Sequence, residues 1–176
     1  AIYGTTISIS NSNFTSNSAN TGGAIYATTN VAINNSKFEK NIATSKNGDV
    51  IWGDGTVTVR DSSFTSNITQ INGIAIKGVN IYVYDSNFDN IAGSCIIQSE
   101  YGAIVIDGCN FTNTNSRFCT GRYAIDIINS NFINSSYEGF TTNLGRNSQS
   151  AGQAKIINST FINCKSTRVL FFNGAR

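Results

Sequence analysis

The chain has 176 residues, a formal net charge of +2 at pH 7 and 12% charged residues. This charge is too small to indicate an anionic membrane or a nucleic acid as partner, and we predict no nucleic-acid binding. No stretch approaches the ~20 consecutive apolar residues of a membrane helix, so we expect no direct membrane span in this segment.

In chain order, one phrase recurs seven times, and each copy ends in a phenylalanine. The copies are ISISNSNF, VAINNSKF, VTVRDSSF, IYVYDSNF, IVIDGCNF, IDIINSNF and AKIINSTF, ending at Phe14, Phe38, Phe64, Phe88, Phe111, Phe132 and Phe161. Successive phenylalanines are 24, 26, 24, 23, 21 and 29 residues apart. A period of roughly 20–30 residues built from short strands and turns is typical of a solenoid. Residues 1–176 are therefore interpreted as a single repeat array.

Each phrase reads as a strand with one buried face. Apolar residues, mostly β-branched, stand seven and five positions before each phenylalanine, and polar residues alternate with them. Asn, Asp or Gly, followed by Ser or Cys, then ends the strand. A second apolar segment completes most turns, at 24–26, 50–52, 74–76, 95–97 and 169–172. We predict an all-β, right-handed parallel β-helix of about seven coils. The alternative is an antiparallel sandwich, which has no reason to restore the same Phe and Asn in every period.

Two internal ladders follow if equivalent residues stack at ~4.8 Å. The seven phenylalanines are predicted to form one core stack. A stack of asparagine amides is predicted beside it, built from the Asn that follows each phenylalanine by two or three positions: Asn17, Asn41, Asn67, Asn90, Asn113, Asn134 and Asn163.

The four cysteines are Cys95, Cys109, Cys119 and Cys164. Cys95 lies seven residues after its phenylalanine and Cys119 eight after the next one, so we expect them to stack on adjacent coils and form a disulfide. Cys109 takes a Ser position and is interpreted as a small buried hydrophobe. No CxxC or Cys/His spacing is present, so no metal and no cofactor are predicted.

Two short motifs carry a family resemblance. Phe-x-x-Asn occurs at 14–17, 38–41 and 64–67, and GGAI occurs at 22–25. This alternation resembles the repeats of polymorphic outer-membrane proteins and related adhesin-like proteins, within the broader pectin-lyase-like β-helix fold. The resemblance implies a secreted or surface-displayed protein. From the fourth repeat the second motif shortens to Phe-x-Asn, so the resemblance supports the fold more than the function.

Outward positions of the first strand suggest two kinds of site. Asp107 and Asp126, on adjacent coils, are the carboxylates that could act as an acid–base pair on a polysaccharide. The signatures of polygalacturonases are absent and the chain has no histidine, so we interpret them as scattered surface charges and predict no catalytic residue. Five apolar residues are expected to form a stripe over the later coils: Tyr82, Tyr84, Val105, Ile128 and Ile157. This stripe is either an interface or a surface covered by the polar excursion at 141–152.

Six Asn-x-Ser/Thr sequons are present. Asn13, Asn34 and Asn110 are expected to face outward and are the candidates for glycosylation. Asn158 is assigned to an inward ladder, and Asn67 is doubtful for the same reason.

The sequence predicts a non-enzymatic extracellular or cell-surface rod, structural or adhesin-like. The alternative is a carbohydrate-active enzyme or a glycan-binding module of the same fold. Residues 1–4 and 169–172 both resemble the second strand of a coil, without a cap. We therefore expect the coil stack to continue past both ends, through the same chain or by end-to-end self-association. Glycans or another cell-surface ligand are further possible partners.

Overall fold

In a computed structural model, the repeat forms successive three-sided coils. The structure describes residues 1–45, 49–69, 73–121, 123–135, 140–143, 153–165 and 170–173. Every element in this part of the chain is a β-strand, and no helix there is long and apolar enough to cross a membrane. All strand pairs are parallel, so the all-β solenoid is confirmed and the antiparallel sandwich is excluded.

Two of the three sides are sheets of seven strands, one strand for each repeat. We call them the first sheet and the phenylalanine sheet. The first sheet consists of β2 (Ile7–Ser10), β6 (Val31–Asn34), β10 (Thr56–Arg60), β14 (Asn80–Tyr84), β17 (Ile104–Asp107), β20 (Ile125–Ile128) and β23 (Ala154–Ile157). The phenylalanine sheet consists of β3 (Asn13–Thr15), β7 (Lys37–Glu39), β11 (Ser63–Thr65), β15 (Asn87–Asp89), β18 (Asn110–Thr112), β21 (Asn131–Ile133) and β24 (Thr160–Ile162).

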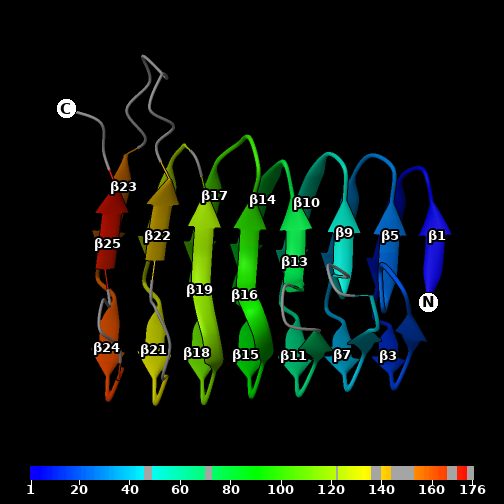
Figure 1. Cartoon of the computed structure of the whole chain (residues 1–176), viewed down its shortest axis with the longest axis horizontal. Helices are drawn as coiled ribbons and strands as arrows, with labels where there is room; N and C mark the ends of the chain where they lie inside the picture. Colours follow the sequence, from blue (N-terminus) through cyan, green and yellow to red (C-terminus); the bar gives the residue numbers. More distant parts are fainter. Residues whose placement is uncertain are drawn as a thin grey trace.

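The third side, the long sheet, contains the second apolar segments and lies toward the viewer in Figure 1. Its main row is β1 (Ile2–Gly4), β5 (Ile25–Ala27), β9 (Ile51–Gly53), β13 (Ile74–Gly78), β16 (Ala92–Ser99), β19 (Asn115–Gly121), β22 (Phe140–Asn143) and β25 (Leu170–Asn173). Three shorter strands pair beside it: β4 (Ser18–Ala19), β8 (Ile42–Ala43) and β12 (Ile68–Thr69). β16 pairs with both β12 and β13, so one long strand replaces the two short strands of the earlier coils.

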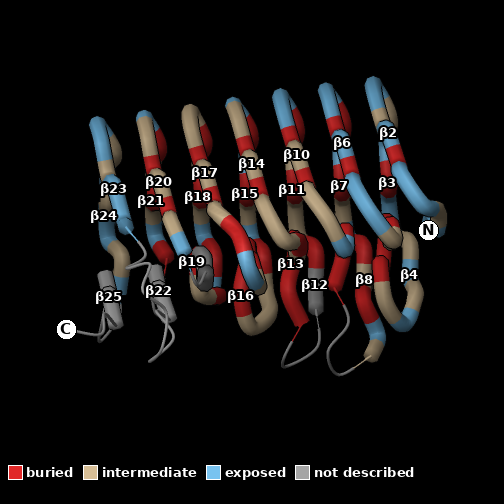
Figure 2. The backbone as a smooth tube through the Cα atoms, turned by 90° about the horizontal axis from the view of Figure 1, so that it is seen from above, coloured by how far each residue is buried: buried red, intermediate tan, exposed pale blue. Residues whose placement is uncertain are grey.

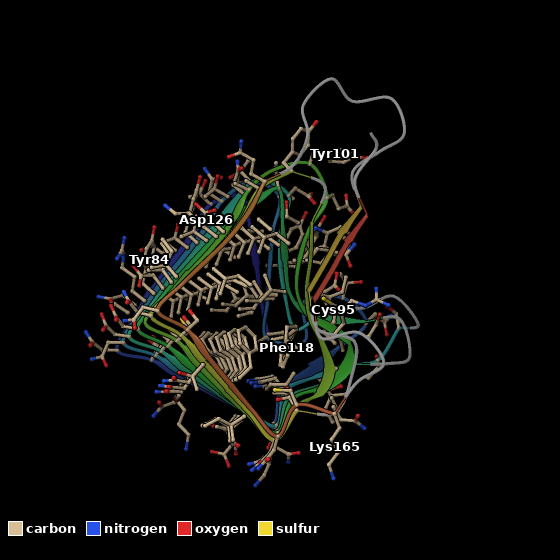
Figure 3. The ribbon with its side chains drawn as sticks, turned by 90° about the vertical axis from the view of Figure 1, so that its left-hand side faces the viewer. Tyr84, Cys95, Tyr101, Phe118, Asp126 and Lys165 are labelled. Atoms are coloured by element: carbon tan, nitrogen blue, oxygen red, sulfur yellow. The ribbon has the colours of Figure 1, made fainter. Side chains whose placement is uncertain are left out.

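The interior contains the predicted phenylalanine stack. Six consecutive ring pairs have centroids 4.7–4.9 Å apart and planes within 7° of parallel. The view along the solenoid axis shows these rings in register behind one another (Figure 3). Buried and exposed residues alternate along the strands of the first sheet, as its period-2 pattern predicts (Figure 2). The core is therefore a narrow column that runs along the axis.

The corner before each phenylalanine explains the Asn/Asp–Ser pattern. The residue three before Phe has φ between 45° and 49° in six coils, and in the fifth coil glycine takes this place, with φ 68° at Gly108. Asn, Asp and Gly are the residues that tolerate this left-handed conformation. The next residue is serine in every coil except the fifth, and most of these hydroxyls accept a bond from the neighbouring coil, as Ser62 Oγ does from Ser36 N at 3.1 Å. Asn158 belongs to the left-handed column and is exposed, so its assignment to an inward ladder is wrong.

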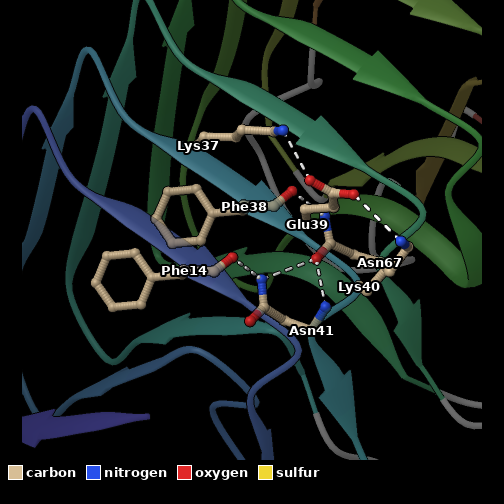
Figure 4. Close-up of polar contacts among 7 residues, drawn as sticks. All are labelled: Phe14, Lys37, Phe38, Glu39, Lys40, Asn41 and Asn67. Carbon is tan, nitrogen blue, oxygen red and sulfur yellow. Dashed lines mark hydrogen bonds and ion pairs between the residues drawn. The ribbon is translucent and has the colours of Figure 1, made fainter.

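The predicted asparagine ladder is wrong as a single column. Asn41 and Asn67 are buried and Asn17 is half-buried, and their amides bond one another along the axis. Figure 4 shows the bond between Asn41 and Asn67. The later asparagines occupy a different, exposed column one position earlier, where φ is 52–53°: Asn90, Asn113, Asn134 and Asn163. In the first three coils that left-handed column holds Ser16, Lys40 and Ser66. The change from Phe-x-x-Asn to Phe-x-Asn is therefore a switch between columns.

The inward column continues without asparagine in the later coils. Ile91, Thr114 and Ser135 are each 1% exposed there, and Cys164 follows them half-buried. Thr114 Oγ1 donates to Ser135 Oγ at 2.9 Å. The ladder of amides thus gives way to an apolar residue and then to smaller polar groups.

The predicted Cys95–Cys119 disulfide rests on a register that the structure does not have. Cys95 stands opposite Arg117, whereas Cys119 stands opposite Ile97. β16 has one more residue than β19 between the Ala92 and Cys95 pairings, which forms a bulge. The bulge adds one position to the one-residue difference in spacing from the phenylalanines, so the two cysteines lie two positions apart. Cysteines so displaced lie outside disulfide reach, and no disulfide is seen among the described side chains. Cys109 is buried as expected, and burial raises the pKa of its thiol to about 12.

Candidate binding surfaces

The predicted apolar stripe on the first sheet divides into two parts. Tyr82 stands beside Val105 in one outward column, whereas Ile128 stands beside Ile157 in the other. Asp107 separates Tyr84 from Ile128 in that second column. Arg60 also covers Tyr84, with its guanidinium carbon 3.9 Å from the ring centroid. Residues 144–152, most of the segment proposed to cover the stripe, lie outside the described residues.

The two outward carboxylates of this face do not stand opposite each other. Asp107 pairs in register with Ile128, and Asp126 pairs with Val105 and Lys155. Asn129 Nδ2 donates to Asp107 Oδ1 at 3.0 Å. Both aspartates belong to outward columns of the sheet, where Figure 3 shows Asp126 and Tyr84. Each of the two aspartates therefore has its own neighbours in register, and neither has the other as its direct cross-strand partner.

The three predicted glycosylation candidates differ in how free their amides are. Asn13 and Asn34 are exposed. Asn110 is half-buried, and its amide donates to Asn87 and accepts from Asn131, each at 2.9 Å. A glycan on Asn110 would have to break this local ladder, so Asn13 and Asn34 remain the more suitable acceptors.

The outer face of the long sheet holds an aromatic row that the sequence analysis missed. Tyr3, Tyr26 and Trp52 follow one another in register on β1, β5 and β9. Their ring centroids are 5.4 and 5.1 Å apart, and the planes are tilted by 45° and 50°. Lys77 takes the next place in the column, with its ammonium 4.3 Å from the Trp52 ring centroid. The sequence pattern that could have predicted this row is the aromatic residue that ends each of three equivalent segments, AIY at 1–3, AIY at 24–26 and VIW at 50–52.

A pocket of about 360 Å³ lies where the aromatic row meets the next corner of the coil. Its polar side chains are Asp54, Lys77 and Glu100, and its aromatic walls are Trp52 and Tyr101. Lys77 Nζ lies 3.0 Å from Glu100 Oε1. Contact with the Trp52 ring and this ion pair hold the ammonium in a defined position.

Tyr26 is connected to the same pocket through Asp54. Its hydroxyl donates to Asp54 Oδ2 at 3.3 Å. Burial and the charge of Asp54 raise the pKa of the Tyr26 phenol. The phenol therefore remains a hydrogen-bond donor at neutral pH.

Asp49 is a fully buried carboxylate beside this pocket. Its Oδ1 accepts a bond from Ile74 N at 2.9 Å, and its Oδ2 has no hydrogen-bond partner. Lys77 Nζ lies 4.0 Å from Oδ2. Burial raises the pKa of Asp49 to about 6, while Lys77 and the bond from Ile74 oppose the rise and Glu100 adds to it. Asp49 is thus a structural carboxyl that titrates close to neutral pH.

We expect the free energy of unfolding to fall by about 3 kcal/mol as the pH rises from about 4 to above 6, because of Asp49. Its pKa rises from 3.8 to about 6 on folding. The stabilisation is therefore fully present below the pKa of Asp49 in the unfolded state, and it is lost as the pH rises through the pKa of Asp49 in the folded state. Asp49→Asn cannot titrate and serves as the control. Thermal melts of both proteins from pH 4 to pH 8 should show the difference in Tm moving in favour of the variant; a constant difference would contradict the assignment.

A second, more polar pocket of about 390 Å³ runs along the corner between the first and the phenylalanine sheets. Residues lining it include Asn13, Asn35, Lys37, Asp61, Asp85 and Asn87. Over the described ranges, no three His, Cys, Asp or Glu side chains are grouped so that they could hold a metal ion.

The molecule thus presents two distinct outer faces, one with a divided apolar surface and one with an aromatic row that ends in a polar pocket.

In comparisons with known proteins, the sequence matches no family model and no curated protein, and the structure matches no solved structure.

Proposed function

We propose that the chain is a non-enzymatic rod, a structural or adhesin-like segment that lies outside the cell or on its surface. The observation that supports this proposal is the unbroken stack of seven phenylalanines, in which each ring contacts the ring of the next coil. A solenoid whose coils contact their immediate neighbours lengthens with the number of repeats, without any change in cross-section. Such a fold suits spacing, display and fibre building.

The GGAI motif adds a physical reason for kinship with adhesin-like repeats of the polymorphic outer-membrane type. A Cβ on Gly23 would lie 2.6 Å from the carbonyl oxygen of Ile42, and Gly22 has φ 62°. Gly23 is required because the turn approaches the backbone of β8 closely, and Gly22 is favoured because of its left-handed conformation. The motif therefore marks a close packing contact between two coils of this chain.

The same proposal extends to assembly. Within the described chain, β2 and β23 pair on one side and present their other edge without a neighbour. Open parallel edges recruit further strands. We propose that the coil stack continues beyond both edges in the native material, through more of the same chain or through a second copy stacked end to end. The second arrangement is heterologous, so repeating it generates an open filament.

Electron microscopy of the native material is expected to show rods or filaments longer than the roughly 34 Å that seven coils supply. Ser8→Pro is the matched variant for the 176-residue chain. Ile7 N donates to Asn30 O, so by the alternation of a parallel ladder Ser8 N faces the open edge. Proline there blocks strand addition while leaving the internal ladder intact. Monodisperse rods of roughly 34 Å in native material would rule out any continuation of the stack. Identical assembly of the variant would rule out end-to-end stacking through the β2 edge.

A further inference from the structure

The aromatic row and the pocket at its end form one continuous surface on the long sheet. Tyr3, Tyr26 and Trp52 come from three successive coils, and Trp52 is also a wall of the pocket. Tyr3 is 73% exposed and the other two rings are half-buried. Large aromatic side chains in a row on an outer face are uncommon on a soluble surface and mark binding sites.

This surface combines apolar ring faces with charged hydrogen-bonding groups. The ring faces offer apolar contact, while the pocket offers a cationic donor at Lys77 and carboxylate acceptors at Asp54 and Glu100. A saccharide matches both features, because a pyranose ring has a face of C–H groups and a rim of hydroxyls that donate and accept hydrogen bonds. One pyranose unit is also comparable in length to the ~4.8 Å step between coils. An extended chain of such units can therefore follow the row along the axis.

The charges of the pocket restrict the class of saccharide. Asp54 and Glu100 face one cation, Lys77, which also lies 4.0 Å from the buried carboxylate of Asp49. The local balance is negative, so a uronate or sulfated chain would be repelled. Lys77 already has a carboxylate partner at 3.0 Å, and an anionic ligand would have to compete with it. A neutral chain can bind without displacing the Glu100 carboxylate from Lys77.

We propose that the long sheet binds a neutral oligosaccharide, with pyranose rings over Tyr3, Tyr26 and Trp52 and the last unit in the pocket between Trp52 and Tyr101. Lys77 donates to a hydroxyl of that unit, and Asp54 and Glu100 accept from its neighbours. The site is complete within a single chain and does not depend on the assembly proposed above, so either proposal can fail without the other.

Trp52 is the single tryptophan of the chain, so its fluorescence reports directly on this site. The probes are hexamers of β-1,4-linked glucose, of β-1,4-linked N-acetylglucosamine and of mannose, with hexagalacturonate as the acidic comparison. At least one neutral hexamer is expected to shift the Trp52 emission in a saturable way, and hexagalacturonate is expected to leave it unchanged. No shift with any of the three neutral hexamers, or an equal response to hexagalacturonate, would overturn the proposal.

Variants locate the binding on the long sheet. Tyr3→Ala removes a strongly exposed ring and Tyr26→Ala removes the central ring; each is expected to weaken binding about tenfold. Tyr26→Phe keeps the ring and should bind within about threefold of the unaltered chain. Tyr84→Ala, on the first sheet, is the matched control and should bind normally. If Tyr84→Ala weakens binding as much as Tyr3→Ala, or if Tyr3→Ala binds normally, the ligand is not on this row.

Discussion

Replacing Phe88 by alanine is expected to lower the free energy of unfolding by about 3–5 kcal/mol. The Phe88 side chain is fully buried, and its ring lies 4.7 Å from the rings of both Phe64 and Phe111. Truncation removes apolar contact on two sides and leaves a cavity that the neighbouring coils cannot close, because their backbones are fixed by parallel ladders. Equilibrium denaturation with urea would measure the loss.

Phe161 provides the comparison within the same stack. Its side chain is half-buried, and its ring lies 4.9 Å from the ring of Phe132. Phe161→Ala is therefore expected to cost clearly less than Phe88→Ala, while Phe64→Ala should cost as much as Phe88→Ala. A loss below about 1 kcal/mol for Phe88→Ala would show that the stack does not support the core.

Replacing Asn41 by alanine is expected to cost roughly 3–5 kcal/mol, although the side chain is polar. Its Oδ1 accepts from the backbone and the amide of Asn17, at 3.1 and 2.9 Å. Its Nδ2 donates to Phe14 O at 2.9 Å and to Asn67 Oδ1 at 3.1 Å. Alanine would leave several buried or half-buried groups without partners in a place that water does not reach easily.

Asn113 is the control, because it follows its phenylalanine by two positions and not three. It is exposed with φ 52°, and its amide donates to Asp89 Oδ1 at 3.0 Å. Asn113→Ala is expected to cost about 1–2 kcal/mol, chiefly for a left-handed conformation, and Asn113→Gly close to nothing. Chemical denaturation of all three variants tests the division into two columns. Equal losses of unfolding free energy for Asn41→Ala and Asn113→Ala would contradict the division into two columns.

The local pattern of the sequence determined the coil itself. Alternating apolar residues before each phenylalanine specify which face of a strand is buried, and this information is contained in a few consecutive positions. The phenylalanine stack followed from the period alone, since one strand per repeat in parallel register must place equivalent rings above one another. The exposed positions of Asn13 and Asn34 could be read from the same alternation.

The contacts between coils were decided by the tertiary structure. The backbone conformation after each phenylalanine makes the third position inward and the second outward, and only the stacked coils supply the inward asparagine with its partners, as Phe14 O does for Asn41. The register of Cys95 and Cys119 depends on one extra residue in β16, which spacing from the phenylalanines does not reveal. The site around Lys77 combines residues from four coils, Tyr26, Trp52, Lys77 and Glu100, that are brought together because strands far apart in the sequence become neighbours along the axis. The repeat specifies the strands and corners of each coil, whereas the environment of a residue that departs from the repeat is set by the coils stacked on either side.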